Sequence, residues 1–143
     1  MDYAIIAAGE GSRLVQEGVK WPKPLVQLNG TALIDRLINV FLKNDASSIS
    51  IIVNEEMTEV QEHLRKLELP VPFYLLVKST PSSMHSFYEL SHHLDSDHIC
   101  LTTVDTIFKE EEFGGYIQAF LKESQLDGLM AVTDFIDDEK PLY

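Results

Sequence analysis

The sequence has few basic residues, one cysteine and no long apolar run. Lys and Arg total 11 against 23 Asp and Glu, so the net charge is -12 at pH 7. A protein of this sign repels a phosphate backbone, which excludes a bulk electrostatic grip on nucleic acid. Cys100 is alone, so an intrachain disulfide is excluded, and its apolar neighbours predict that it fills the core.

No apolar stretch approaches the roughly 20 residues that cross a bilayer. The first residues, Met1 to Gly9, lack the basic region of a signal peptide. We therefore expect a soluble cytoplasmic protein that binds neither nucleic acid nor membrane. Nothing in the sequence decides whether it forms a homo-oligomer.

Apolar runs typical of buried strands alternate with apolar residues at helical spacing. We predict strands at 3–7, 50–53, 73–77, 99–104 and 129–135, and helices at 33–42, 57–67, 84–94 and 113–121. Asn29-Gly30 predicts a small hairpin over 25–31. The alternation predicts an α/β fold with a doubly wound, mostly parallel sheet and helices on both faces. Because no helix follows the last strand, we expect residues 1–143 to be the N-terminal part of a truncated domain.

Three polar features are expected to meet at the carboxyl ends of the strands, where open α/β sheets bind ligands. The segment Ala7-Ala8-Gly9-Glu10-Gly11-Ser12-Arg13 follows the first strand, and its glycines allow backbone N–H groups to form an anion-binding nest. Lys23 stands between Pro22 and Pro24, which restrict the backbone on both sides. Asp105 directly follows the strand at 99–104, where a carboxylate suits Mg²⁺.

Each feature has a purely structural alternative. The glycines can form an ordinary turn, Lys23 can be a solvated loop charge, and Asp105 can cap a helix. The glycine segment is not a P-loop, and Leu14 stands where a dinucleotide-binding fingerprint has its third glycine. None of the five histidines has the spacing of a metal site.

The segment Ala-Ala-Gly-x-Gly-Ser-Arg-Leu, followed by Pro-Lys-Pro-Leu, resembles the signature of the sugar-phosphate nucleotidylyltransferases. The resemblance covers essentially the whole chain and implies a Rossmann-like nucleotidyltransferase domain. It implies transfer of a nucleoside monophosphate from a nucleoside triphosphate to a sugar 1-phosphate or similar phosphorylated acceptor, with release of pyrophosphate. It also implies dependence on Mg²⁺, and we expect residues 1–143 alone to be inactive.

The resemblance implies a role for each matching residue. Ala7, Ala8 and Gly9 would line the base and ribose, whereas Gly11, Ser12 and Arg13 would hold the triphosphate. Lys23 would contact the phosphates near the reacting centre, and Asp105 would bind Mg²⁺.

The chain departs from the family pattern in the base-reading loop and in its metal site. Lys78 and Ser83 occupy places where the family often has Gln and Gly, so they are the expected base-side contacts. Asp105 follows Val104 instead of Gly, and a second metal-binding Asp is expected beyond residue 143. These departures leave open a nucleotide-binding or regulatory module without turnover. A dinucleotide-dependent oxidoreductase is a third alternative, with acids at Glu55 and Glu56 after the second strand.

Overall fold

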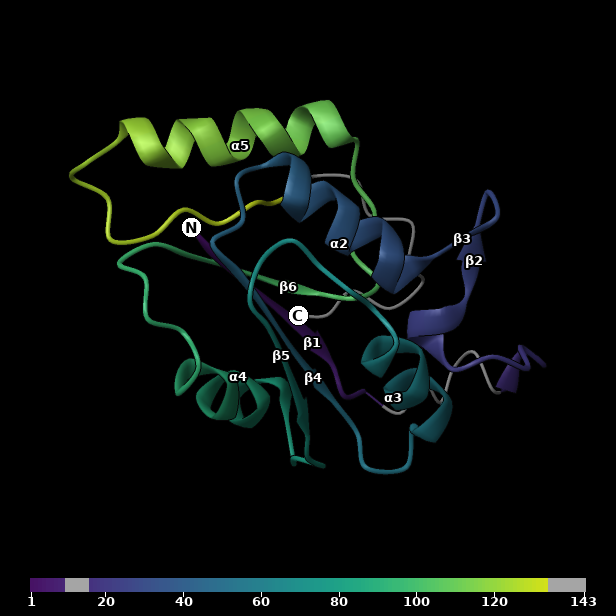
Figure 1. Ribbon diagram of the computed structural model, residues 1–143. Helices are drawn as coiled ribbons and strands as arrows, with labels where there is room; N and C mark the ends of the chain where they lie inside the picture. Colours follow the sequence, from purple (N-terminus) through teal and green to yellow (C-terminus); the bar gives the residue numbers. More distant parts are fainter. Residues whose placement is uncertain (10–15, 134–143) are drawn as a thin grey trace. The chain divides into compact units, whose positions relative to one another are not determined.

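The computed structural model describes residues 1–9 and 16–133. A four-stranded parallel sheet forms its centre, with strand order β5-β4-β1-β6 (Figure 1). The strands are β1 (Asp2–Ala7), β4 (Ser48–Val53), β5 (Phe73–Val77) and β6 (Ile99–Thr103). In the central register, Ile5 of β1 lies opposite Ile51 of β4 on one side and Thr102 of β6 on the other. The predicted α/β class and parallel sheet are confirmed.

The helices between these strands are α2 (Leu33–Lys43), α3 (Thr58–Arg65) and α4 (Ser83–Ser91). The chain divides into two compact units, Met1–Ile107 and Phe108–Tyr143. The second unit contains α5 (Glu110–Lys122), whose first turn carries Glu110, Glu111 and Glu112 at the positive end of the helix dipole.

Side chains alternate between the two faces of the sheet, and each face has its own helical cover. On one face, the rings of Tyr3 and Phe41 of α2 stack with centroids 4.3 Å apart. On the other face, Ala4 and Ile6 form a buried cluster with Ile52 and with Leu90 of α4. Helices therefore cover both faces of the sheet, as the sequence predicts.

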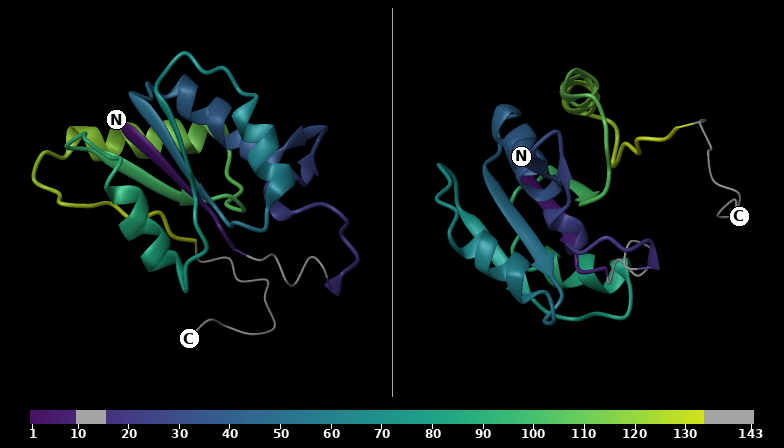
Figure 2. Two further views of the ribbon diagram at one scale, coloured as in Figure 1. Left: turned by 60° about the horizontal axis from the view of Figure 1, so that its bottom comes forward. Right: turned by 90° about the vertical axis from the view of Figure 1, so that its right-hand side faces the viewer.

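A separate two-stranded sheet pairs β2 (Gln27–Leu28) with β3 (Thr31–Ala32) and lies apart from the main sheet (Figure 2). Its turn residues, Asn29 and Gly30, both have positive φ angles, of 52° and 82°. Two-residue hairpin turns favour Asn-Gly because both positions need this conformation. The predicted hairpin is confirmed.

The strand predicted at 129–135 is wrong for its described part, since residues 129–133 form no strand. A strand needs a hydrogen-bonding partner, and within the described residues Leu129 instead accepts a hydrogen bond at its carbonyl from the Tyr116 hydroxyl of α5, at 2.5 Å. Met130 and Val132 are exposed. An apolar run predicts a strand only where a neighbouring edge is available to pair with it. None of the helices within the described residues has the length and hydropathy needed to cross a membrane.

Candidate active site

The strand order contains one point at which the direction of winding reverses. From β1 the chain adds β4 and then β5 on one side, and then returns to place β6 on the other side of β1. In open α/β sheets, ligands bind at the carboxyl ends of the two strands that flank such a reversal. The carboxyl ends of β1 and β6 are therefore the expected place for a site.

The chain leaves both strands at this edge. The Val104 N–H donates a hydrogen bond to the Ile6 carbonyl at 3.2 Å, so the segment after β6 follows β1 to its end. Asp105 is the next residue. On the β1 side, Ala7 is buried, Ala8 is half-buried and Gly9 is exposed. Among the described residues, a Cβ atom at Gly9 would meet nothing within 4 Å, so no described residue packs closely against its backbone.

Lys23 is presented by a short, stiff segment, the 3-10 helix η1 (Lys23–Leu25). Pro22 precedes it in an extended conformation, and the Leu25 N–H donates to the Pro22 carbonyl at 2.8 Å. Pro24 is buried, which anchors the segment from inside. The two prolines thus restrict the backbone. The four-carbon side chain of Lys23 is flexible, so its ammonium group can reach more than one partner.

Lys23 and Asp105 meet directly, although 82 positions separate them. The Lys23 Nζ lies 2.6 Å from the Asp105 Oδ2, and the side chains are 31% and 45% exposed. The predicted meeting of these two residues at one rim of the sheet is confirmed. Gly11, Ser12 and Arg13, which were predicted to join them, lie outside the described residues.

Asp105 is held ionised by its neighbours. Partial burial by itself raises the pKa of this carboxyl, but hydrogen bonds from Lys23 and Thr103 outweigh burial and bring the pKa below its usual range. Thr103 also shares a 2.9 Å hydroxyl–hydroxyl hydrogen bond with Thr106. The alternative that Asp105 caps a helix is wrong, since α5 begins at Glu110 with Lys109 at its cap position.

The oxygen atoms around Asp105 suit a hard cation. They comprise a carboxylate and the hydroxyls of Thr103 and Thr106. Within the described ranges no group of three or more His, Cys, Asp or Glu residues is arranged to hold a metal ion. A single protein carboxylate fits Mg²⁺, because Mg²⁺ in phosphate-transferring sites takes most of its other ligands from substrate phosphates and water.

The two residues predicted to contact the base flank the connection between β5 and α4. Lys78 is engaged by α4, with its Nζ 2.7 Å from Glu89 Oε1, and this hydrogen bond lowers the pKa of Glu89. Ser83 is the exposed first residue of α4. Lys78 and Ser83 therefore lie at opposite ends of one loop, and each is attached to α4.

Sequence reasoning missed a set of hydroxyl contacts in this loop. Ser79 donates to the Asn54 side chain at 3.0 Å, and Thr80 shares a hydrogen bond with Ser86 at 2.6 Å. The Ser82 hydroxyl caps α4 and lies 2.8 Å from the His85 Nδ1. The signal in the sequence is the hydroxyl-rich run Ser79-Thr80-Pro81-Ser82-Ser83. Thr103 was missed in the same way.

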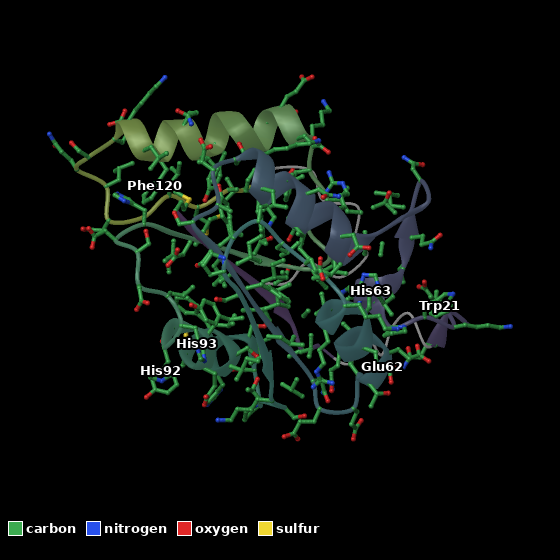
Figure 3. All side chains as sticks on the ribbon, viewed as in Figure 1. Trp21, Glu62, His63, His92, His93 and Phe120 are labelled. Carbon is green, nitrogen blue, oxygen red and sulfur yellow. The ribbon has the colours of Figure 1, made fainter. Side chains whose placement is uncertain are left out.

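His63, His92 and His93 each contact a neighbouring side chain. His63 of α3 pairs with Asp35 of α2 at 2.7 Å and so ties two neighbouring helices together. His92 and His93 directly follow α4, well away from His63 (Figure 3). His93 stacks on Tyr74, and His92 meets the ring of Tyr88 edge-on.

The geometry agrees with comparisons to known proteins. The family model for the MobA-like NTP transferase domain matches residues 3–142. This chain belongs to the MobA-like NTP transferase family. Membership makes it a nucleotidyltransferase-type domain and argues against the dinucleotide-dependent oxidoreductase.

Two curated proteins are similar to this chain in sequence. The chain is 28% identical over 144 residues to the bifunctional protein GlmU of Thermodesulfovibrio yellowstonii, covering 100% of the chain and 30% of that protein. It is 28% identical over 111 residues to a 2-aminoethylphosphonate cytidylyltransferase of Lancefieldella rimae, covering 75% of the chain and 44% of that protein. The chain thus spans less than half the length of each.

Solved structures share the fold of this MobA-like domain. The inositol-1-phosphate CTP transferase of T. maritima superposes with a TM-score of 0.65 at 20% identity, over 76% of this chain and 45% of that one. The CTP:phosphocholine cytidylyltransferase LicC of Streptococcus pneumoniae gives a TM-score of 0.56 at 23% identity, over 77% and 49%. These similarities show the nucleotidyltransferase fold.

Proposed function

We propose that this protein is a nucleotidylyltransferase that transfers a nucleoside monophosphate from a nucleoside triphosphate to a phosphorylated small molecule, releasing pyrophosphate. The observation that carries the proposal is the Lys23–Asp105 pair beside the carboxyl ends of β1 and β6. A cation that can grip phosphate and a carboxylate that can hold a metal stand together where this fold binds ligands. Family membership supports the same reaction class.

The proposed reaction is one in-line displacement. An oxygen of the acceptor phosphate forms a bond to the α-phosphorus of the triphosphate, and the bond from that phosphorus to the pyrophosphate oxygen breaks. No covalent intermediate with the protein is required. Catalysis then rests on positioning and on stabilising negative charge as it develops.

The residues divide this work between them. Lys23 holds the α-phosphate or the acceptor phosphate, while Arg13, Ser12 and the loop amide of Gly11 hold the β- and γ-phosphates. Asp105, oriented by Thr103, would hold Mg²⁺. When bound there, Mg²⁺ would neutralise phosphate oxygens.

The nucleoside end of the substrate would lie toward the loop after β5. Ala7, Ala8 and Gly9 line the base and ribose in this proposal, and the lack of any described atom within 4 Å of a Cβ at Gly9 is compatible with a close approach. Lys78 and Ser83 would contact the base. Lys78 would either break its ion pair with Glu89 to do so or contact the base while keeping that pair.

The acceptor class follows from the requirement for a phosphorus oxyanion as nucleophile. The relatives' names include 2-aminoethylphosphonate, inositol 1-phosphate and phosphocholine, all small molecules with such an oxyanion. We propose an acceptor from this class or a sugar 1-phosphate.

Pyrophosphate release tests the proposal directly. The longest natural version of the chain is assayed with CTP, UTP, GTP, ATP and dTTP against sugar 1-phosphates, phosphocholine and 2-aminoethylphosphonate. We expect release with at least one pair, dependent on both substrates and on Mg²⁺. Binding of a triphosphate without release from any pair would favour the alternative of a nucleotide-binding module.

A further inference from the structure

The Asp105 carboxylate, which is proposed to bind the metal ion, already forms an ion pair with Lys23. The Lys23 ammonium lies 2.6 Å from Asp105 Oδ2, within hydrogen-bonding distance of the oxygen that a metal ion would use. We infer that Lys23 and a divalent cation compete for Asp105, and that triphosphate relieves the competition by giving Lys23 a new partner. The part concerning triphosphate rests on the proposed function, whereas the competition does not.

Charge makes the two cations exclusive. An ammonium and a divalent ion on one carboxylate would stand within a few ångströms of each other and repel strongly in a half-buried site. Mg²⁺ also demands a near-octahedral shell, which a donor group pressed against the carboxylate obstructs. Lys23 must therefore leave before the cation can bind.

Within the described ranges, few other protein ligands can offset this competition. No group of three or more metal-ligating side chains exists there, so the described part of the chain offers the cation little besides Asp105. The free protein should consequently bind divalent cations weakly. Thr103 and Thr106 add only neutral oxygens.

Triphosphate changes both sides of this balance. Its oxygens supply the missing ligands to the cation and a fresh anionic partner for Lys23. The stiff backbone of η1 keeps Lys23 at the site while its flexible side chain exchanges Asp105 for phosphate. Cation and nucleotide should therefore bind with positive coupling, each tightening the other.

The first experiment removes the competitor and measures cation binding without nucleotide. Mn²⁺ is titrated into the full chain, and free Mn²⁺ is followed by its electron paramagnetic resonance signal. We expect Lys23→Met to tighten Mn²⁺ binding roughly five-fold, the size that loss of a half-exposed ion pair can produce. Lys109→Met removes the same charge from the exposed pair with Glu112 and should leave Mn²⁺ affinity unchanged.

Two further variants make the result specific. Lys23→Gln repeats the test with a neutral polar side chain should Lys23→Met fail to fold. Adding Asp105→Asn to the Lys23 variant should abolish the gain. The inference is overturned if neither Lys23 variant binds Mn²⁺ more tightly than wild type, if Lys109→Met gains as much, or if the gain survives Asp105→Asn.

The second experiment measures the coupling. Triphosphate binding is followed with and without Mg²⁺ by the fluorescence of Trp21, the sole tryptophan, which is 60% exposed and two residues from Lys23. Labelled nucleotide in equilibrium dialysis provides a second readout. We expect Mg²⁺ to tighten triphosphate binding more in wild type than in Lys23→Met, because the variant has no competitor to displace.

The two proposals fail separately. If no triphosphate binds any variant while Lys23→Met still gains Mn²⁺ affinity, the proposed function is wrong and the competition stands. If triphosphate binds and Mg²⁺ tightens it equally in both proteins, the exchange of partners is overturned while the proposed function stands.

Discussion

Lys23 and Asp105 form a half-exposed ion pair whose position matters more than its contribution to stability. Exposed pairs of this kind stabilise a protein by about 0.2–1 kcal/mol, whereas one fully buried Ile or Phe contributes about 1.5–3 kcal/mol. The core of β1, β4 and α2 therefore holds the fold without this pair. Its value lies in bringing opposite charges to the edge where substrate phosphates are proposed to bind.

Removing either charge should slow the proposed reaction without unfolding the protein. Lys23→Ala or Asp105→Ala should each lower turnover by roughly 100-fold or more, since one charge-assisted contact to the transition state is worth about 3 kcal/mol. Pyrophosphate release by the longest natural version measures the effect, with circular dichroism to check folding. Near-normal turnover in both variants would refute these assignments.

The ionisation of Asp105 gives a prediction for pH. Burial alone raises its pKa, but Lys23 and Thr103 lower it overall, so the folded value lies below that of the unfolded chain. The stabilisation is thus fully present above the ordinary pKa of aspartate and is lost as pH falls through the lowered value. A carbon-13 NMR titration should show this depression, and Lys23→Met should raise the pKa. A titration unchanged by Lys23→Met would contradict it.

Cys100 is predicted to be chemically silent in the folded protein. It is buried on β6, and burial raises the pKa of its thiol to about 11. Because only the thiolate reacts, a thiol reagent such as DTNB at pH 8 should label native protein slowly and denatured protein at once. Rapid labelling of the native chain would show that this strand opens readily.

At the scale of elements, Asp2 joins the start of β1 to the turn before β6. Its Oδ2 accepts hydrogen bonds from the N–H groups of Asp95 and Ser96, at 3.0 and 2.9 Å, and the residue is buried. This contact helps to hold the turn from which β6 enters the sheet beside β1. Asp105 lies two residues beyond the other end of β6.

Replacing Asp2 should destabilise the fold. Asp2→Ala leaves two half-buried N–H groups without their acceptor and should lower the free energy of unfolding by about 1–3 kcal/mol. Urea denaturation followed by circular dichroism measures the change. Asp97→Ala, in the exposed part of the same turn, is the matched control and should have little effect. An equal decrease in the free energy of unfolding in both variants would show that the hydrogen bonds to Asp2 do not specifically stabilise the fold.

Helices and strands were predicted correctly where the local pattern of apolar residues determines them. The prediction failed where a strand depends on pairing with a neighbouring strand. The strand at 73–77 was predicted with its observed bounds, and the helix from Leu33 ends one residue later than predicted. The run Leu129-Met130-Ala131-Val132 has the composition of a strand, yet residues 129–133 form none. The availability of a partner edge depends on the tertiary structure and is not written in that run.

At the scale of the whole molecule, charge sets which anions the protein binds. With a net charge of -12, the chain repels extended polyanions, while Lys23 offers a local site for one small anion. Electrophoretic mobility shift at about 0.1 M salt should show no complex with duplex DNA. A salt-sensitive complex would contradict the prediction, and a basic DNA-binding domain serves as the positive control.

The sequence by itself determined the parallel α/β class, the hairpin at Asn29-Gly30 and the resemblance to nucleotidyltransferases, because periodicity, turn chemistry and motif spacing are local properties. Only the tertiary structure decided which of those residues meet. Strand order places the end of β6 beside that of β1, so Asp105 and Lys23 form a pair across 82 positions. The tertiary structure also brings Lys78 into contact with Glu89 and Thr103 into contact with Asp105. Such contacts between side chains depend on how the chain packs.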